Sequence, residues 1–368
     1  MPMAKNTIFS TGIYTIFIFL LGVNEKNNKD LGQPKKIIVV RQHNQLGDLL
    51  SSVSLLRAIK ETYPDSHLTL ILSPVNYPGM VKNRFIDRLF VFDKKNIFNP
   101  FRFYKFWKLL RVNYDLAIAP VVVSISFTSN LIARLSNSKV RIGPASLNGD
   151  KNKSDYFFDR RVHLDWRKEP DSNVAERILD IVRPFGINTQ NYRAEINFNG
   201  IDSSAAESFI KSNFEIRKKL IIGLHVGAGK YNNRWPVEKF ADLIKKLDKN
   251  YSANFYLTGS QADQESIEFI KNNSDVALGY FLNKPIPQVA ALVSKSDLFI
   301  SNDTGIMHVA GTTDTPQVSI FGPTNPFNWA PIGPDKHFIR KSELIDDVTV
   351  DDVYQLCDVV LKKKESKA

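Results

Sequence analysis

The sequence contains a single cysteine, Cys357, among 368 residues. One cysteine excludes an intramolecular disulfide and a thiolate metal cage. The six histidines are scattered along the chain, so the sequence offers no histidine-based metal site either. It also lacks a Walker A loop, a glycine fingerprint after the first predicted strand, a His-Glu-x-x-His helix and a nucleophile elbow. The chain therefore lacks the common signatures of nucleotide hydrolases, dehydrogenases, zinc proteases and serine hydrolases.

The positive charge of the chain is concentrated in its first half. Residues 35–200 contain 26 Lys and Arg against 15 Asp and Glu, whereas residues 201–368 contain 20 against 21. A one-sided basic surface indicates an anionic partner, such as nucleic acid, acidic lipid headgroups or an acidic glycan. Because no RNA- or DNA-binding module is recognisable, we expect no nucleic-acid partner.

Length and hydrophobic pattern predict two α/β domains. A chain of 368 residues with 43% hydrophobic residues is long enough for two cores. Apolar runs rich in β-branched residues alternate with amphipathic segments, which is typical of doubly wound parallel sheets. We predict an N-terminal extension at 1–34, a first domain at 35–200, a second domain at 201–345, and a C-terminal helix with a basic tail at 346–368. The predicted strands are 35–41, 67–73, 89–92, 116–123, 219–226, 253–258, 297–301 and 317–321, and the predicted helices are 48–63, 236–248, 261–270, 287–294, 304–311 and 351–361.

Residues 8–23 form an apolar stretch of 16 residues. A membrane-spanning helix needs about 20 apolar residues. Three interpretations stay open: a short membrane anchor, a cleaved signal peptide, and an interfacial or buried helix. More lysines follow the stretch than precede it, which favours a cytoplasmic location for the rest of the chain.

Residues 100–113 combine basic and aromatic side chains. Lys or Arg recurs every three residues, at positions 102, 105, 108 and 111, with aromatic residues and leucines between them. Such a helix resembles those that lie on membrane surfaces. The alternative is an ordinary helix whose apolar side faces the core.

The loop between the first strand and the first helix contains Gly47 and Asp48. Gly47 allows the backbone to approach a ligand closely. Asp48 has two possible roles: it can cap the helix, or it can accept a proton from an attacking hydroxyl group. A helix start also lowers the pKa of a carboxyl group, which weakens it as a base.

Two junctions in the second half contain small and polar residues after a strand. The first contains His225, Gly227 and Ala228, and either Lys230 or Arg234 can neutralise a phosphate there. The second follows the strand at 253–258 and contains a possible nucleoside contact, since carboxylates accept hydrogen bonds from ribose hydroxyls. Its candidate residues are Gly259, Ser260, Asp263 and Glu265.

A third junction, at residues 301–310, joins a buried strand to a helix with a small, polar first turn. Backbone amides at such a helix start favour phosphate oxygens. His308, one turn into the helix, either donates to the same anion or packs in the core. The predicted grip on a diphosphate comprises Asp303, Thr304, Gly305, Ile306 and His308.

Together these segments resemble glycosyltransferase family 9, the bacterial lipopolysaccharide heptosyltransferases. The resemblance covers about residues 36–333 and rests on their order and spacing. One position departs from the pattern, because many members have a lysine where this chain has Asn233. The matching motifs are Leu46-Gly47-Asp48, His225-x-Gly-Ala-Gly, Arg234-Trp235-Pro236, Thr258-Gly259-Ser260, Asn302-Asp303-Thr304-Gly305-x-x-His308 and Phe321-Gly322-Pro323-Thr324.

The resemblance implies a GT-B fold, with an acceptor-binding first domain and a donor-binding second domain. It implies inverting transfer of a heptose from a nucleotide donor, typically ADP-linked, without an obligatory metal or other cofactor. By position, Asp48 becomes the general base and Asp303 to Gly305 the diphosphate grip. We expect an anionic glycolipid acceptor, and a protein at the cytoplasmic side of the inner membrane, peripheral or with a short N-terminal anchor. Two other functions fit the same fold: a sugar-nucleotide epimerase, and a non-catalytic sugar-nucleotide-binding assembly factor at the membrane.

Overall fold

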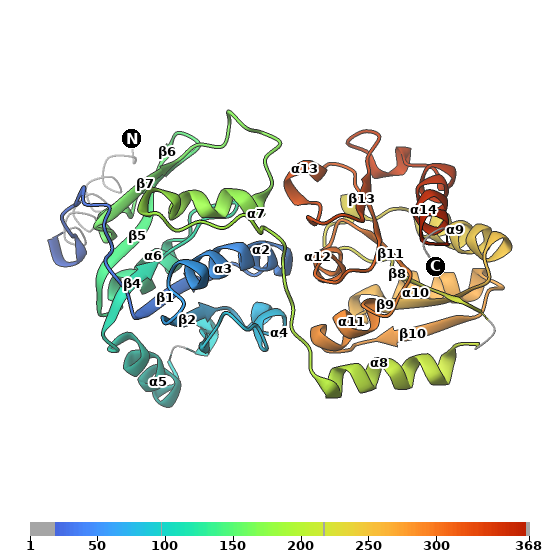
Figure 1. Ribbon diagram of the computed structural model, residues 1–368, viewed down its shortest axis with the longest axis horizontal. Coiled ribbons are helices and arrows are strands. Elements are labelled where there is room, and N and C mark those ends of the chain that lie inside the picture. Colours follow the sequence, from blue (N-terminus) through green and yellow to red (C-terminus); the bar gives the residue numbers. More distant parts are fainter. Residues whose placement is uncertain (1–18, 97, 216–217, 366–368) are drawn as a thin grey trace, which may run out of the picture.

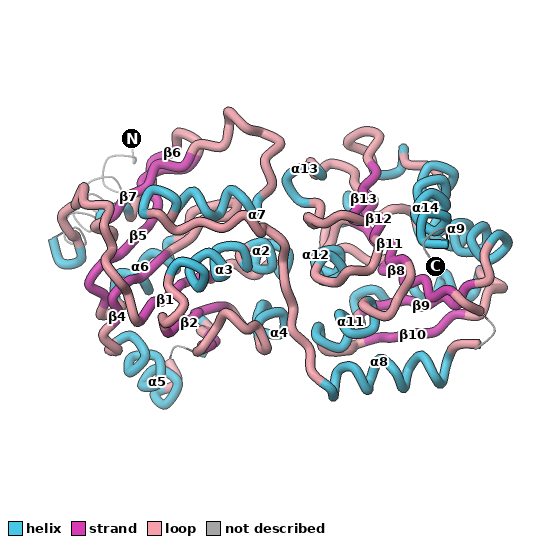
Figure 2. Tube along the Cα trace, in the orientation of Figure 1, coloured by secondary structure: helices cyan, strands magenta, loops and turns pink. Residues whose placement is uncertain are grey.

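Two parallel β-sheets, each covered by helices on both faces, form the two halves of the chain (Figure 1). The computed structural model describes residues 19–96, 98–215 and 218–365. Figure 2 shows that the helices lie outside the strands in both halves. The predicted doubly wound α/β class is therefore confirmed.

The first sheet has seven strands in the order β3-β2-β1-β4-β5-β6, with β7 also paired to β5. All pairs are parallel except β5 with β6. The order turns back between β1 and β4, which is the position where open α/β sheets bind ligands. The strands are β1 (Lys36–Arg41), β2 (His67–Leu72), β3 (Arg88–Val91), β4 (Tyr114–Ile118), β5 (Ser138–Leu147), β6 (Asp150–Lys151) and β7 (Arg160–Leu164).

Helices α2 to α7 accompany the first sheet in the described part of the chain. The predicted helix 48–63 is divided at Ser52 into two helices, where the hydroxyls of Ser51 and Ser52 donate to the carbonyls of Gly47 and Asp48. Serine hydroxyls that bond to carbonyls one turn earlier disturb a helix. The helices are α2 (Leu46–Ser51), α3 (Val53–Thr62), α4 (Tyr77–Met80), α5 (Pro100–Leu110), α6 (Phe127–Leu135) and α7 (Val174–Arg177).

The second sheet has six parallel strands in the order β10-β9-β8-β11-β12-β13. The order turns back between β8 and β11, so the second ligand crevice lies at the carboxyl ends of these strands. The strands are β8 (Leu220–His225), β9 (Ala253–Gly259), β10 (Leu278–Leu282), β11 (Leu298–Asn302), β12 (Gln317–Ile320) and β13 (Lys336–Ile339).

Helices of the second half pack on both faces of its sheet. Helix α14 packs on α9, and α8 packs on α11. Cys357, on α14, is fully buried in the resulting core. The helices are α8 (Gly200–Asn213), α9 (Val237–Asn250), α10 (Gln264–Asn273), α11 (Ile286–Val293), α12 (Gly305–Gly311), α13 (Pro326–Trp329) and α14 (Val350–Glu365).

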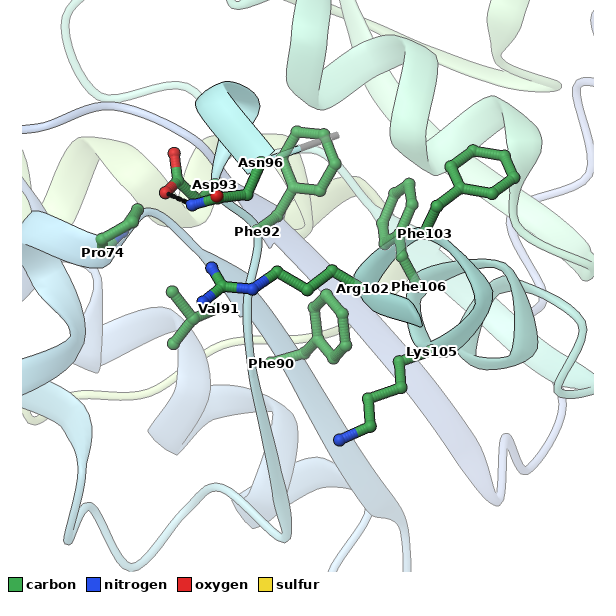
Figure 3. Close-up of a pocket in the computed structure, with 10 residues that line it drawn as sticks. All are labelled: Pro74, Phe90, Val91, Phe92, Asp93, Asn96, Arg102, Phe103, Lys105 and Phe106. Atoms are coloured by element: carbon green, nitrogen blue, oxygen red, sulfur yellow. Dashed lines mark hydrogen bonds between the residues drawn. The ribbon is translucent and has the colours of Figure 1, made fainter. Parts of the chain in front are cut away.

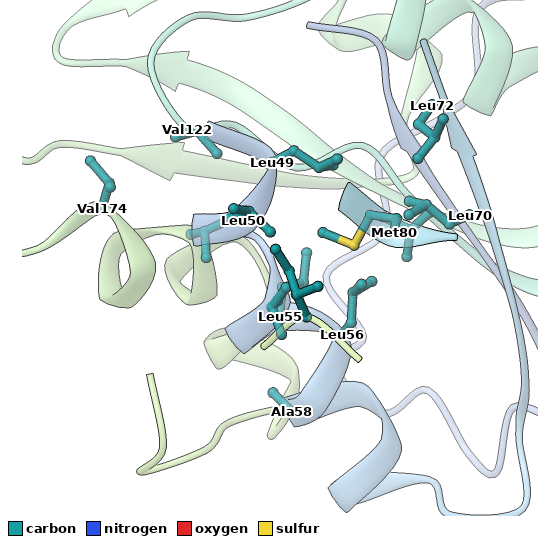
Figure 4. Packing of buried hydrophobic residues seen from close by; sticks show 14 of the residues in the cluster. Leu49, Leu50, Leu55, Leu56, Ala58, Leu70, Leu72, Met80, Val122 and Val174 are labelled. Carbon is teal, nitrogen blue, oxygen red and sulfur yellow. The ribbon is translucent and has the colours of Figure 1, made fainter. Parts of the chain in front are cut away.

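One apolar core continues from the first half into the second. It contains side chains of α2 and α3, which Figure 4 shows packed with Leu70, Leu72 and Met80. The same cluster includes Val309 and Ala310 of α12 and five buried residues of α11. Burial of this apolar surface stabilises the contact between the two halves, at roughly 25 cal/mol per Å².

The segment before α8 connects the halves and is fastened to both. The guanidinium of Arg57 donates to the carbonyls of Asn191 and Arg193, at 2.6 and 2.8 Å. Arg193 in turn forms an ion pair with Asp314 of the second half, at 2.6 Å. The connection is therefore held by charged groups at two successive points.

Only part of the apolar stretch 8–23 falls within the described residues. Residues 19–23 are described, and the backbone amide of Val23 donates to the carbonyl of Tyr156, at 2.9 Å. In the described ranges, no helix has the length and apolar character that crossing a bilayer requires. Residues 1–18 lie outside the described residues, so the three interpretations of this stretch stay predictions.

Candidate active site

The two ligand crevices meet where α2 touches α12 (Figure 1). Helix α2 follows β1 in the first half, and α12 follows β11 in the second. Both helices begin at the carboxyl ends of central strands, so their first turns face each other across the domain boundary. This arrangement brings Gly47 and Asp48 next to the segment 303–308.

Asp48 is the third residue of α2 and is buried, with 4% of its surface exposed. The N-cap position belongs to Gln45, so the possible capping role of Asp48 is not realised. Burial raises the pKa of Asp48 above its usual value, although the positive charges of Arg41 and Lys230 oppose the rise. A raised pKa makes the carboxylate a stronger base than an exposed aspartate, despite its position near a helix start.

Arg41 and His43 form the first-domain side of the site, and sequence analysis missed both. Arg41 is buried, and its Nη2 donates to Asp48 Oδ2 at 3.4 Å. Its Nη1 contacts His43 Nδ1. Because arginine can only donate, His43 must carry its proton on Nε2, which lies 3.0 Å from Ser124 Oγ. A charged residue at the end of an otherwise apolar strand was the one available signal for Arg41.

The imidazole of His43 is neutral at physiological pH. Burial lowers its pKa to about 4, and the positive charges of Arg41 and Lys94 act in the same direction. The backbone carbonyl of His43 accepts from Ser73 Oγ and from Asn76 Nδ2. The side chains around Asp48 are therefore held by hydrogen bonds from several segments of the first half.

His308 packs across the domain boundary onto Gly47. A β-carbon added to Gly47 would lie 2.6 Å from His308 Cδ2 and 2.7 Å from Nε2. Burial lowers the pKa of His308 to about 4, so the imidazole is neutral. Its ring centroid lies 6.2 Å from that of Trp329, in an edge-on contact. Of the two roles considered for His308, the structure shows the packing contact.

Lys230 lies near acidic groups from both halves. Its positive charge opposes the effect of burial on the pKa of Asp48 and of Asp303. Asp303 Oδ2 accepts a hydrogen bond from Asn233 Nδ2 at 2.8 Å. Lys230, Asn233 and Thr324 also line one open pocket of about 480 Å³. The pocket therefore opens beside Lys230 and beside Asn233, which donates to Asp303.

Arg234, the other proposed phosphate contact, points elsewhere. Its Nε donates to the carbonyl of Ala228 at 2.8 Å. Its side chain lines a separate pocket of about 650 Å³, together with Trp235 and Glu265. Of the two basic candidates, only Lys230 thus lies beside the two acids.

The first turn of α12 faces the first domain, and no side chain of the described residues caps it. Thr304 occupies the N-cap in an extended conformation, and within the described chain its hydroxyl makes no capping bond. Leu46 lies beside the next residue, since a β-carbon on Gly305 would be 3.4 Å from Leu46 Cβ. The Ile306 amide follows in the same turn. This geometry is compatible with an anion at the amides of residues 304–306.

Asn302 fixes the loop that precedes α12. Its Nδ2 donates to the carbonyl of Val226 at 2.9 Å, and its Oδ1 accepts from the Trp235 amide at 3.1 Å. The side chain is fully buried. It thereby ties the loop after β8 to the loop after β11, which places Lys230 and Asp303 in the same part of the crevice.

The nucleoside candidates form a second cluster around Asp263. Asp263 Oδ2 accepts from the amide and hydroxyl of Ser260, at 2.8 and 2.9 Å. Its side chain also lies against Gly227, where an added β-carbon would be 1.8 Å from Oδ1. His225 is buried nearby and its Nδ1 lies 3.0 Å from the Thr258 carbonyl. An added β-carbon on Gly259 would be 3.5 Å from Asp263 Cβ.

This cluster contains five of the predicted nucleoside residues. Ala228 is buried at its edge, and Glu265 is separate because it faces the pocket with Arg234. The carboxylate of Asp263 is already engaged by Ser260. Among residues 19–96, 98–215 and 218–365, no group of three or more His, Cys, Asp or Glu side chains is placed to hold a metal ion.

Comparisons with known proteins by sequence and by structure point to the same family. Residues 103–352 match the family model described as Glycosyltransferase family 9 (heptosyltransferase). The lipopolysaccharide core heptosyltransferase OpsX of Haemophilus influenzae is 24% identical over 308 residues, which cover 81% of this chain and 82% of that protein. The described fold is also similar to two solved structures.

The first is a glycosyl transferase family 9 protein from Veillonella parvula, with a TM-score of 0.78 and 20% identity. The match covers 92% of this chain and all of that one. The second is the E. coli ADP-heptose lipopolysaccharide heptosyltransferase II, with a TM-score of 0.73 and 19% identity over 90% of this chain and 99% of that one. Both likenesses confirm the GT-B arrangement of two domains.

Proposed function

Since the chain belongs to glycosyltransferase family 9, we propose that it transfers a heptose from ADP-heptose to a lipopolysaccharide inner core or a similar anionic glycolipid. The observation that carries the proposal is the contact of α2 with α12, which brings Asp48 of the first half next to the segment 303–308 of the second, where the charge of Lys230 acts on both Asp48 and Asp303. It supports a site in which Asp48 acts as the base and the segment 303–306 binds the diphosphate across one crevice. A transfer site needs both groups within reach of one reacting carbon.

The proposed reaction is an inverting displacement. The acceptor hydroxyl attacks the anomeric carbon, and the bond between that carbon and the diphosphate oxygen breaks. Asp48 takes the proton of the hydroxyl, and the nucleoside diphosphate leaves. The amides of residues 304–306 and the ammonium of Lys230 stabilise the negative charge that develops on the leaving group. We propose that no obligatory metal takes part, as the family resemblance implies.

The two halves take the two substrates. The donor nucleoside lies against the cluster around Asp263, and its diphosphate reaches the start of α12. The acceptor enters on the side of Arg41 and His43. The excess of basic residues in the first half supports an acceptor that carries phosphate or carboxylate groups. ADP-heptose as donor is supported by the similarity to the E. coli ADP-heptose lipopolysaccharide heptosyltransferase II.

We further propose that the protein works at the cytoplasmic side of the inner membrane. Lipid-linked acceptors are held at a bilayer, and the basic first domain would be attracted to anionic headgroups there. The N-terminal stretch 8–23 is a candidate for a short anchor. A peripheral attachment by the described part of the chain is the other form of the same proposal.

A panel of nucleotide sugars, each with and without a lipopolysaccharide inner-core acceptor, tests the function. We expect release of ADP only when ADP-heptose and acceptor are both present, with a heptose added to the acceptor mass. A changed sugar nucleotide without acceptor would instead identify an epimerase. Nucleotide binding without consumption of any donor would identify a non-catalytic factor.

A further inference from the structure

Helix α5 exposes a row of aromatic side chains. Its buried side consists of Phe106, Leu109 and Leu110, so the alternative of a core-packed helix holds for that side alone. The aromatic side chains on the other sides are at least 47% exposed, and so is Phe98 just before the helix. Large apolar side chains gathered in this way mark an interaction surface. The exposed aromatics are Phe98, Phe101, Phe103, Tyr104 and Trp107.

Basic residues are interleaved with these aromatics. Residues 94–111 contain six Lys and Arg and no Asp or Glu. Lys105 Nζ lies 4.2 Å from the ring centre of Phe101, and Arg111 Cζ lies 5.1 Å from that of Trp107. Protein–protein interfaces are depleted in lysine at their centres. A mixture of lysine with aromatic residues on one helix is instead typical of a helix that lies on a membrane.

A pocket of about 300 Å³ opens between α5 and β3. Its walls include Phe90, Phe92 and Phe106. Figure 3 shows Arg102 extending from α5 between Phe90 and Phe92, with Lys105 at another margin. Asp93 also lines the pocket, and its carboxylate accepts a hydrogen bond from Asn96. The apolar walls and the cations at the rim match the chemistry of a lipid, which joins an acyl chain to an anionic headgroup.

We propose that α5 and the residues just before it, Lys94, Lys95 and Phe98, form a docking face for a bilayer that contains anionic phospholipids. The exposed aromatics enter the region between headgroups and acyl chains. The basic side chains contact lipid phosphates, and the pocket holds part of one lipid.

The docking face lies close to the acceptor side of the crevice. Pro74 lines the pocket, and Asn76, two residues later, donates to the His43 carbonyl. The positive charge of Lys94 contributes to the lowered pKa of His43. A bilayer bound at α5 would therefore lie next to the entrance that leads to Asp48. The role of α5 in bringing a membrane-bound acceptor to Asp48 rests on the proposed function, whereas the binding of α5 to a bilayer does not.

Co-sedimentation of the purified chain with vesicles tests the docking face. The vesicles are phosphatidylcholine alone, or phosphatidylcholine with 30% phosphatidylglycerol, and neither donor nor acceptor is present. We expect binding to the anionic vesicles and weak binding to the neutral ones. Each basic residue near an anionic surface contributes about fivefold to binding. Lys105→Glu/Lys108→Glu should therefore weaken binding by about 25-fold or more.

Matched variants on the second domain provide the control. Lys245 and Lys249 are exposed on α9, four residues apart, whereas the α5 pair is three residues apart. Lys245→Glu/Lys249→Glu makes the same change in net charge and should leave most of the binding intact. Equal losses in the two double variants would overturn the proposal, because they would show a response to net charge alone.

Trp107 supplies a built-in reporter of insertion. Of the four tryptophans, Trp107 is 47% exposed, whereas Trp166 and Trp235 are buried and Trp329 is partly buried. Anionic vesicles should shift its emission to the blue, and Trp107→Phe should remove the shift while the protein still binds. An unchanged emission spectrum on bound vesicles would overturn insertion of α5.

Transfer to a deacylated, soluble acceptor separates this proposal from the function. The Lys105→Glu/Lys108→Glu variant should retain that activity while it loses activity on acceptor embedded in vesicles. Loss of both activities would show that these lysines serve the reaction itself and would contradict a pure docking role. Vesicle binding by a protein that transfers no sugar would leave docking in place and overturn only the proposed function.

Discussion

The imidazole of His308 occupies the space in which a side chain at position 47 would have to lie. A β-carbon on Gly47 would approach His308 Cδ2 to 2.6 Å, which is well inside van der Waals contact. Because His308 is buried against Trp329, it has little room to move away. A glycine at this position is thus a condition for the contact between α2 and α12.

Gly47→Ala should therefore hold the two domains apart at the site. We expect a fall in kcat/KM of about 10²-fold, since displacements of 1 Å can cost that much. The measurement is steady-state transfer, together with small-angle scattering to detect a more open particle.

Gly229→Ala is the control for this experiment, because an added β-carbon there meets no atom within 4 Å. Adding His308→Ala to Gly47→Ala should restore part of the activity, and a lack of any recovery would contradict the steric explanation.

Asp48→Asn should abolish most of the transfer and leave nucleotide binding almost unchanged. General-base catalysis contributes about 10²–10⁴-fold, and an amide cannot accept the proton of the hydroxyl. Calorimetry with ADP checks binding, and released ADP with acceptor present checks turnover. A wild-type kcat in the Asp48→Asn enzyme would show that Asp48 is not the general base.

Removal of the Arg41 charge should shift the pH dependence of the reaction. Burial raises the pKa of Asp48, and Arg41 is the largest opposing influence. Arg41→Gln should therefore raise the pKa of Asp48 further, so that the base becomes protonated at a higher pH. The acid limb of the kcat/KM profile is expected to move upward in pH.

The buried pair Arg160 and Asp159 provides the comparison for that experiment. The two side chains lie 3.0 Å apart in the first domain, and both residues are buried. Arg160→Gln removes a buried cation from an acid that is not placed in the reaction. It should cost stability without moving the acid limb, and an equal movement in both variants would point to a general electrostatic effect.

Lys230 and Arg234 should differ sharply in their importance for the donor. Loss of a charge-assisted hydrogen bond costs about 1.5–3 kcal/mol, which is roughly 10- to 100-fold. We expect Lys230→Met to raise the KM for the donor in that range. Arg234→Met should have a much smaller effect, because its Nε is engaged by the Ala228 carbonyl. The reverse order would place the diphosphate in the pocket beside Glu265.

Sequence patterns located the central strands well because these are buried on both faces. The run Lys36–Arg41 is apolar from Ile37 to Val40, and β1 follows it closely. Strand β5 was missed, because Lys139, Arg141 and Pro144 interrupt its apolar pattern. The sequence also did not reveal the break at Ser52, which depends on local serine hydroxyl bonds rather than on hydrophobic spacing.

The sequence predicted the glycines and acids that the structure brings together at the candidate site, but not the side chains that contact them. Gly47, Asp48 and the segment 303–308 stand out because strand-to-helix junctions concentrate such residues. His43 contacts Ser124, which is 81 residues away in the sequence, so no local sequence pattern predicts this contact. The direction of the Arg234 side chain was equally hidden, since it depends on the position of the Ala228 carbonyl.

The burial of Cys357 makes the chain a convenient host for spectroscopic labels. The thiol is fully enclosed in the core of the second domain, and burial raises its pKa, so it should resist maleimide reagents in the folded protein. A cysteine introduced at exposed Lys245 and another at exposed Leu135 could then be labelled without removal of the native residue. A donor and an acceptor fluorophore at these two positions would report, molecule by molecule, how far the domains separate as nucleotide arrives and departs.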